Sequence, residues 1–211
     1  GLMELGLGRD IRRTHWDIPS CMVHPWHDVT PAIEGLALPG HFKAIVEIPK
    51  GSKNKYELDK GSGMLKLDRV VSSAVHYPAN YGFIPLTLAG DGDPIDVLVL
   101  MDEPVFPGVH VWARPVGVME MRDEAGPDAK IMAVPYGDPR WDQIQDLDDL
   151  PALLRSEIDH FFEVYKALEP GKSTETSSWG DRARAHELII EARADYKPAP
   201  PLVPKRRANE R

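Results

Sequence analysis

The sequence predicts an α+β fold that is mainly β, with strands in the first two thirds of the chain and helices after them. Between about residues 41 and 140, short stretches alternate apolar and polar residues and are separated by turns that contain glycine or proline. This pattern is typical of half-buried strands in a small barrel or sandwich. Between residues 148 and 169 the apolar residues recur every three or four positions, which indicates an amphipathic helix. The 211 residues suffice for a single domain with one proper core.

The two ends of the chain carry no regular pattern. Residues 1–36 contain several prolines and an HPWHD stretch without a period of 2 or 3.6, so we expect an irregular arm on the domain or on a neighbouring subunit. Residues 197–211 are rich in proline and then basic, which predicts a flexible tail. Residues 37–196 then form the folded body, with strands and two main helices.

The strand region can be divided at its turns. In FKAIVEIP (42–49), Ala44 and Val46 face one way and Glu47 the other. A GSKN turn leads into KYELDKGSGMLKLDRVV (55–71), which predicts a hairpin that turns at its two glycines. Three further strands are expected in DVLVL (96–100), VHVWARPVGVMEM (109–121) and KIMAVP (130–135).

Two helices are expected after the strands. In the first, over 148–169, apolar residues such as Leu154, Ile158 and Phe161 share one face. Asp149 precedes its start, and Gly171 is a typical stop. The second helix is expected over about 181–196.

Charge and cysteine content exclude several classes of protein. The net charge is -8, with 33 acidic against 25 basic residues, which disfavours nucleic-acid binding because phosphate contacts need a basic surface. The single cysteine, Cys21, cannot form an internal disulfide, which indicates a reducing compartment. No apolar stretch has the length of a signal peptide or of a membrane span. We therefore expect a cytoplasmic protein that does not enter the membrane.

The most informative motif is DGDPID, residues 91–96, directly before an apolar strand. Asp91, Asp93 and Asp96 repel one another unless a cation lies among them. Gly92 permits a tight turn and Pro94 stiffens it, so the loop presents several oxygens toward one point. Oxygen ligands in a rigid arrangement suit Mg2+. Judged from this loop alone, a solvated turn remains an equal alternative.

Three other phosphate or metal motifs fit less well. A calcium loop needs glycine at its sixth position, where this chain has Asp96, and a phosphatase that forms an aspartyl-phosphate carries its nucleophile after a strand. Gly171-Lys172-Ser173 lacks the earlier glycine of a nucleotide-binding loop and is better explained as a helix stop.

Other segments carry side chains with complementary chemistry. Lys55 and Glu57 share one face of a strand, and Arg69 follows two leucines at period 2, so it is expected to point inward with them. Asp123, Asp128 and Lys130 are expected in a loop between strands. Hydroxyl donors and one further cation come from Tyr77, Tyr81, Tyr165 and Lys166. Each residue alone is best read as an ordinary ion pair, turn residue or core aromatic, but together they supply the mixture that phosphoryl transfer to water needs.

With these residues in view, the chain resembles the family I (soluble) inorganic pyrophosphatases over roughly residues 40–170. The resemblance is carried, in order and spacing, by VEIP, KYELDK, DRVVSS, HYPANYGFIP, DGDPIDVLVL, RPVGVMEMRDEAGPDAKIMAVP and HFFEVYK. It implies a five-stranded barrel of the OB type with helices packed outside. It also implies hydrolysis of inorganic diphosphate to two phosphates by direct in-line attack of a water that metal ions activate.

The resemblance further implies a role for each candidate residue. Asp93 would be the general base, and Mg2+ would be held by Glu47, Asp91, Asp96, Asp123 and Asp128. Pyrophosphate, entering as a magnesium complex, would contact Lys55, Arg69, Tyr81, Lys130, Tyr165 and Lys166, with Glu57 and Tyr77 in support. Roughly three to four Mg2+ ions per site are implied, with Mn2+ or Zn2+ as possible substitutes. A homo-oligomer is also implied, with a hexamer favoured, although the opening arm leaves the number of subunits open.

Two other functions can be weighed against this hypothesis. A hydrolase of larger anhydrides such as nucleoside triphosphates would use similar metal chemistry, but no base-stacking platform can be identified. A small barrel that binds single-stranded nucleic acid would need a basic groove with aromatic residues, whereas the only basic run here is Lys205–Arg207. His24 and His27 are close enough in sequence to bind a transition metal, but surface histidines without that role are commoner.

Overall fold

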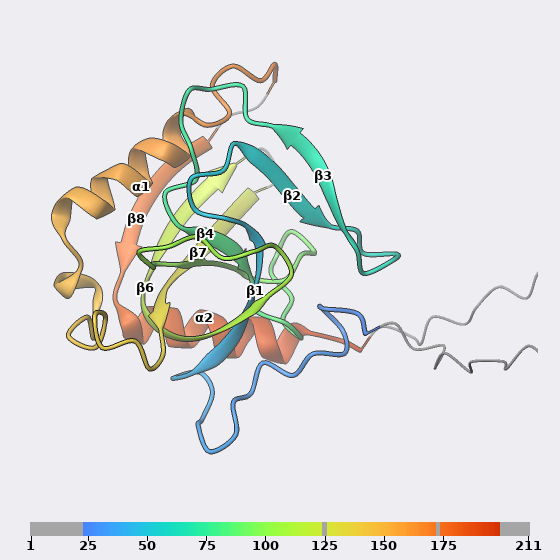
Figure 1. Cartoon of the computed structure of the whole chain (residues 1–211), viewed down its shortest axis with the longest axis vertical. Coiled ribbons are helices and arrows are strands. Elements are labelled where there is room, and N and C mark those ends of the chain that lie inside the picture. Colours follow the sequence, from blue (N-terminus) through green and yellow to red (C-terminus); the bar gives the residue numbers. More distant parts are fainter. Residues whose placement is uncertain (1–22, 124–125, 172–173, 199–211) are drawn as a thin grey trace, which may run out of the picture.

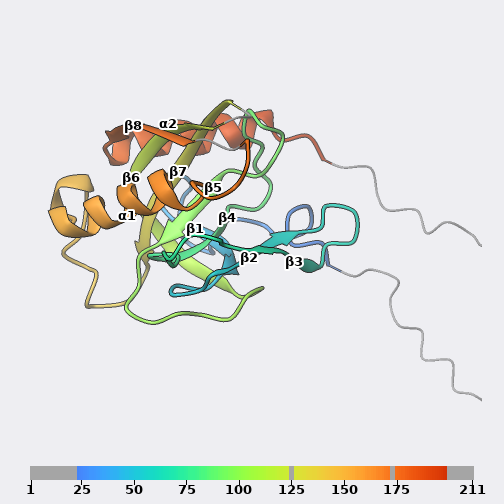
Figure 2. The ribbon, with the colours of Figure 1, turned by 90° about the horizontal axis from the view of Figure 1, so that it is seen from above.

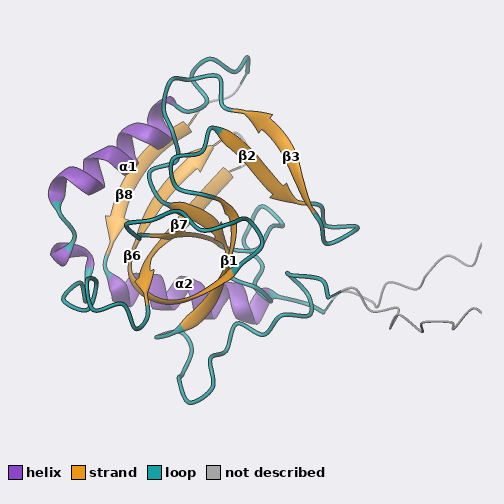
Figure 3. Cartoon of the chain, in the orientation of Figure 1, coloured by secondary structure: helices purple, strands orange, loops and turns teal. Residues whose placement is uncertain are grey.

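The computed structural model describes residues 23–123, 126–171 and 174–198. Most of the expected tail lies outside these residues, and the described part of the arm, 23–36, contains no helix or strand. The fold is a sheet-rich α+β arrangement with two main helices (Figure 3). Its strands are β1 (Phe42–Ile48), β2 (Asn54–Leu58), β3 (Leu65–Val70), β4 (Asn80–Phe83), β5 (Asp96–Val99), β6 (His110–Asp123), β7 (Gly126–Pro135) and β8 (Thr174–Gly180).

Six strands form one sheet in the order β1-β4-β5-β7-β6-β8, and β1 pairs in addition with β6. The pairings therefore run from β1 through β4, β5, β7 and β6 and return to β1, as the ring of strands in Figure 1 shows. All of these pairs are antiparallel except β5 with β7. The long strand β6 closes the ring, because it pairs with β7 along its length and with β1 over its first half. Its second half also pairs with β8.

Two helices lie against the sheet near their expected positions, but the first is shorter than expected: it ends at Val164 with Tyr165 as its C-cap, before the expected stop at Gly171. Helix α1 (Ala152–Val164) follows a short 3-10 turn, η1 (Leu147–Asp149), and α2 (Arg182–Asp195) begins directly after β8. Figure 2 shows α2 along one side of the strands and α1 at their end. Asp181 is the N-cap residue of α2, because its side chain accepts a hydrogen bond from the backbone N–H of Arg184.

The central strands are buried on both faces. Along β5, Leu98 packs in the cluster that contains the α1 residues Phe161 and Phe162, whereas Val97 and Val99 pack in the cluster that contains Ala185 and Ile189 of α2. The same alternation holds along β7. Because successive side chains point to opposite faces of a strand, a continuous apolar run such as VLVL serves two cores at once.

The structure corrects three expectations. Strands β4 and β8 were not anticipated, and the stretch expected as a loop between Asp123 and Lys130 is mostly strand, because β6 reaches Asp123 and β7 begins at Gly126. The side chain of Leu67 is 55% exposed, so Arg69 does not share an apolar, inward face with the leucines before it. The cause lies in the register of β2 against β3, which shifts between Lys55 and Tyr56 and so interrupts the alternation.

No helix among the described residues is long and apolar enough to cross a membrane.

Candidate active site

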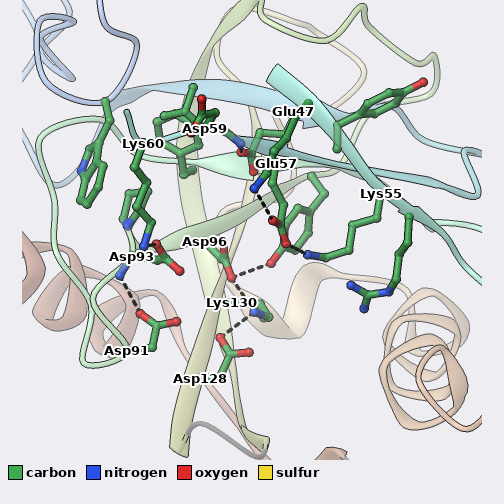
Figure 4. A pocket seen from close by; sticks show the side chains of 18 of the residues that line it. Glu47, Lys55, Glu57, Asp59, Lys60, Asp91, Asp93, Asp96, Asp128 and Lys130 are labelled. Carbon is green, nitrogen blue, oxygen red and sulfur yellow. Dashed lines mark hydrogen bonds and ion pairs between the residues drawn. The ribbon is translucent and has the colours of Figure 1, made fainter. Parts of the chain in front are cut away.

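A cavity of about 550 Å3 is lined by residues of the ring of strands and of the β2–β3 hairpin. It gathers carboxylates, cations and tyrosines from β1, β2, β3, β4, β5, β7 and the end of α1 (Figure 4). The expected site residues that line it are Glu47, Lys55, Glu57, Arg69, Tyr81, Asp91, Asp93, Asp96, Asp128, Lys130, Tyr165 and Lys166.

The DGDPID stretch forms the turn that leads into β5. Gly92 has a φ of 87°, a conformation that glycine adopts without strain. The Asp91 carboxylate accepts a hydrogen bond from the backbone N–H of Asp93 at 3.0 Å, which fixes both aspartates relative to each other. Asp96 opens β5 and pairs in register with Lys130 of β7. Burial raises the pKa of Asp91, so a cation at this loop would be stabilising.

Lys130 lies at the centre of the site and is 3% exposed. Its ammonium donates to Asp96 Oδ2 and to Asp128 Oδ1, each at 2.5 Å (Figure 4). Burial by itself would lower the pKa of Lys130, but the two carboxylates outweigh it and raise that pKa. One buried cation therefore balances two aspartates, as a buried charge requires.

Tyrosine hydroxyls surround this group. The Tyr81 hydroxyl donates to Asp96 Oδ2 at 2.5 Å, and burial followed by the charge of Asp96 raises its pKa well above the ordinary value. Burial also raises the pKa of Tyr165, at the C-terminal end of α1. Both phenols therefore stay protonated near neutral pH and can donate hydrogen bonds to an anion. The ammonium of Lys166 lies 5.6 Å from the centre of the Tyr165 ring.

The hairpin supplies the opposite wall. Lys55 and Glu57 of β2 form an ion pair, and Lys55 lies 3.7 Å from Asp68. Arg69 of β3 donates from Nε to Glu169 at 2.8 Å and from Nη1 to Asp68 at 2.5 Å. These pairs raise the pKa of Arg69 although burial opposes them, so the guanidinium stays charged at the rim of the cavity.

Glu47 is the most buried carboxylate of the site, at 8% exposure. One of its oxygens accepts the backbone N–H of Leu58 at 2.7 Å, which links β1 to the end of β2. Burial, and then the charge of Asp96, raises the pKa of Glu47 to about 8. A negatively charged Glu47 is therefore unfavourable at this buried position unless a nearby cation compensates its charge.

One expected site residue, Tyr77, does not reach the cavity wall, and the side chain of another, Asp123, is not described. Tyr77 is not among the lining residues; it is 2% exposed and packs behind Tyr81, with ring centres 5.5 Å apart. The backbone of Asp123 ends β6, but its side chain lies outside what the structure describes.

Six further polar or aromatic residues line the cavity that sequence reasoning did not single out: Trp26, Tyr56, Asp59, Lys60, Lys66 and Phe83. Asp59 and Lys60 directly precede the glycines of the hairpin turn. They could have been predicted as site residues if the hairpin had been expected to fold over the DGDPID loop. Nothing in the local sequence around Trp26 places it next to residues more than 60 positions away.

The donor set suits a hard divalent cation, because seven carboxylates line the cavity and, among the described residues, no cysteine or histidine does. In the described part of the chain, no three His, Cys, Asp or Glu side chains are arranged to hold a metal ion. One reason for this is that Asp96 and Asp128 both form ion pairs with Lys130, which balances their charges. The carboxylates nevertheless face one space from separate elements, so the chemistry of the residues fits the cation.

Comparisons with known proteins identify the family of this chain. The model of the family "Inorganic pyrophosphatase" matches residues 44–197. An inorganic pyrophosphatase of Leifsonia xyli is 56% identical over 148 residues, which cover 70% of this chain and 91% of that protein. One of Haloferax volcanii is 48% identical over 83% of this chain and 98% of its own length.

Among solved structures, inorganic pyrophosphatase from Thermus thermophilus superposes with a TM-score of 0.78 at 45% identity. The superposition covers 82% of this chain and 98% of that one. Both the sequence and the arrangement of its elements therefore show that this chain belongs to the inorganic pyrophosphatase family.

Proposed function

We propose that this chain hydrolyses inorganic pyrophosphate to two phosphates in the cavity described above, by direct in-line attack of water and with Mg2+ as the cofactor. The observation that carries the proposal is the convergence of carboxylates with cationic and hydroxyl donors in one cavity. Phosphoryl transfer to water needs these two sets of groups and no covalent intermediate. Membership of the family supports the same activity.

The carboxylates would hold the cations. Magnesium, when bound, would neutralise phosphate charge and lower the pKa of the attacking water. Its ligands would be Glu47, Asp91, Asp96, Asp123 and Asp128, holding roughly three to four ions per site, and Mn2+ or Zn2+ could replace it. Because these ions arrive partly with the substrate, an acidic protein can accept an anion.

The other residues would bind and orient the substrate. Lys55, Arg69 and Lys130 would donate to the phosphate oxygens, joined by Tyr81, Tyr165 and Lys166, while Glu57 and Tyr77 keep their neighbours in place. These donors are fixed by ion pairs and burial, so they can stabilise developing charge on the leaving phosphate without reorganising. Asp93 would orient the water and accept its proton.

Several features of the whole protein belong to the same proposal. The closed pairing of β1, β4, β5, β7 and β6 would be an OB-type barrel, and residues 1–211 would form one pyrophosphatase domain. We also propose a homo-oligomer, with a hexamer favoured, and a cytoplasmic location.

The test is phosphate release from pyrophosphate by metal-stripped protein at neutral pH. Release is expected to be fast only after Mg2+ is added, and Asp93→Asn is expected to lower kcat by about 100-fold or more while Mg2+ binding persists. Faster turnover of ATP than of pyrophosphate would favour a nucleotide hydrolase instead. No release from folded, Mg2+-loaded protein would contradict the proposal.

A further inference from the structure

The β2–β3 hairpin needs support from outside its own strands. Strands β2 and β3 pair only with each other in the described sheets, and an isolated two-stranded hairpin is marginally stable. Its tip is closed locally by Asp59, whose side chain accepts from Ser62 at 2.6 Å and whose carbonyl accepts from the backbone N–H of Gly63 at 2.8 Å. These bonds shape the tip but do not fix where it lies above the cavity.

The arm supplies that support. His24 Nε2 lies 3.1 Å from the carbonyl oxygen of Lys60. A Cβ atom placed on Gly63 would come within 2.9 Å of the His24 ring, so ring and tip are in close contact at a position where only glycine fits. The arm therefore packs directly against the end of the hairpin, through His24 and its neighbour Pro25.

The same arm segment is anchored to the loop that follows β4. The indole of Trp26 donates to the carbonyl of Thr87 at 2.8 Å, and the backbone N–H of Leu86 donates to the carbonyl of Trp26 at 2.9 Å. Trp26 is 6% exposed. The chain after Thr87 continues into the turn that contains Asp91 and Asp93, so the arm connects the hairpin tip to the base of that turn.

Lys60 is the residue that this arrangement places over the site. Its ammonium forms an ion pair with Asp93, lies 3.4 Å from the carbonyl oxygen of Gly92 and stands 5.9 Å above the Trp26 ring. In Figure 4 the side chain of Lys60 extends toward Asp93. The two side chains are about half exposed, at 54% and 49%, so the pair adds little to folding stability. Its effect lies in the orientation of the carboxylate.

We propose that Lys60 is a positioning residue for Asp93, and that the arm segment 24–28 holds the hairpin tip so that Lys60 stays in place. The inference rests on the proposed role of Asp93 as the base. Misplacement of a catalytic group by about 1 Å costs up to roughly 100-fold in rate, so a fixed partner for this exposed carboxylate matters for turnover. The family match begins at residue 44, so the arm lies outside the matched region.

The first test is kinetic. Lys60→Met is expected to lower kcat about tenfold, with KM for pyrophosphate and Mg2+ affinity within about twofold of the original. Lys60→Arg is expected to restore most of kcat, because it keeps the charge. Lys53→Met serves as the matched control: Lys53 precedes the same hairpin but does not line the cavity, and its kcat should not change.

A double-mutant cycle separates positioning from direct substrate binding. If Lys60 acts through Asp93, Lys60→Met lowers kcat in the original chain but has no further effect in the Asp93→Asn background. A raised KM that persists in the Asp93→Asn background would overturn the proposal, because Lys60 would then bind substrate itself. An unchanged kcat in Lys60→Met, together with an inactive Asp93→Asn, would refute the positioning role of Lys60 but leave the role of Asp93 intact. Full activity of Asp93→Asn would instead refute the base.

The arm is tested through Trp26. Trp26→Ala is expected to reproduce part of the Lys60→Met loss in kcat and to add little to it when the two are combined. Circular dichroism and the Tm establish that each variant is folded before its kinetics are compared. Losses in kcat that multiply independently in the double variant would overturn the role assigned to the arm.

Discussion

At the scale of single residues, the site is governed by how buried charge is balanced. Lys130 is enclosed between Asp96 and Asp128, and its side chain is 4% exposed. Removing one member of a buried charge group leaves the others uncompensated, which costs more than the pair itself contributes. In metal-free protein this lysine is therefore structural, whatever it does toward substrate.

Lys130→Met is predicted to lower the free energy of unfolding of the metal-free protein by about 3–5 kcal/mol, because two carboxylates lose their cation. Added Mg2+ should raise the Tm of this variant more than that of the original protein, since a bound cation takes over the charge balance. Thermal unfolding with and without Mg2+ measures both effects. Equal Mg2+ shifts in the two proteins would contradict the argument, and Lys53→Met should behave as the original.

At the scale of elements, close backbone approach decides which strands can pair. Gly82 lies in β4, opposite Val46 of β1, and an added Cβ there would overlap the carbonyl oxygen of Ile45. Gly82→Ala is predicted to destabilise the fold by about 4 kcal/mol or more, because backbone atoms cannot move aside as a flexible side chain can. Urea unfolding checks this. Gly90→Ala, with open space around its Cβ, is the control, and a Gly82→Ala as stable as Gly90→Ala would be the contrary result.

The start of α2 gives a milder prediction. The Asp181 carboxylate accepts the backbone N–H of Arg184 at 2.9 Å and so satisfies one free donor of the first turn. Asp181→Ala is predicted to lower the free energy of unfolding by about 1 kcal/mol, and Asp181→Asn by less, because asparagine still accepts. Chemical denaturation distinguishes the two. Equal losses for both variants would show that the cap bond is not the cause.

Elements and site differ in how far the sequence predicts them. DVLVL is recognisable because a rigid Gly/Pro turn precedes an apolar run, and helix α1 shows its period clearly. Strand β4 is not predicted because Pro78 and Gly82 interrupt the alternating pattern around it, and β8 is not predicted because its sequence, TETSSWG, is polar. The expected carboxylates could be collected from motifs, but Lys60 and Trp26 could not, because their proximity depends on contacts between distant segments.

At the scale of the whole molecule, histidines outside the cavity set a dependence of stability on pH. Burial lowers the pKa of His27, His41 and His186 from the ordinary value of 6.5, and a nearby arginine lowers it further for His41 and His186. His186 Nε2 is buried without a hydrogen-bond partner among the described residues, so its protonation gains no acceptor there.

Below pH 6.5 each of these histidines therefore binds more protons in the unfolded chain than in the folded one. The stabilising effect of these neutral histidines is complete above that pH and is lost as the pH falls through the lowered values. The histidines are thus predicted to lower the free energy of unfolding between pH 7.5 and 5.5, so over this range the original chain should lose stability relative to a His41→Gln, His186→Gln double variant. Urea denaturation at several pH values measures both slopes. Since carboxylates also titrate toward acid, only the difference between the slopes reports on the histidines, and identical slopes would refute their part in it.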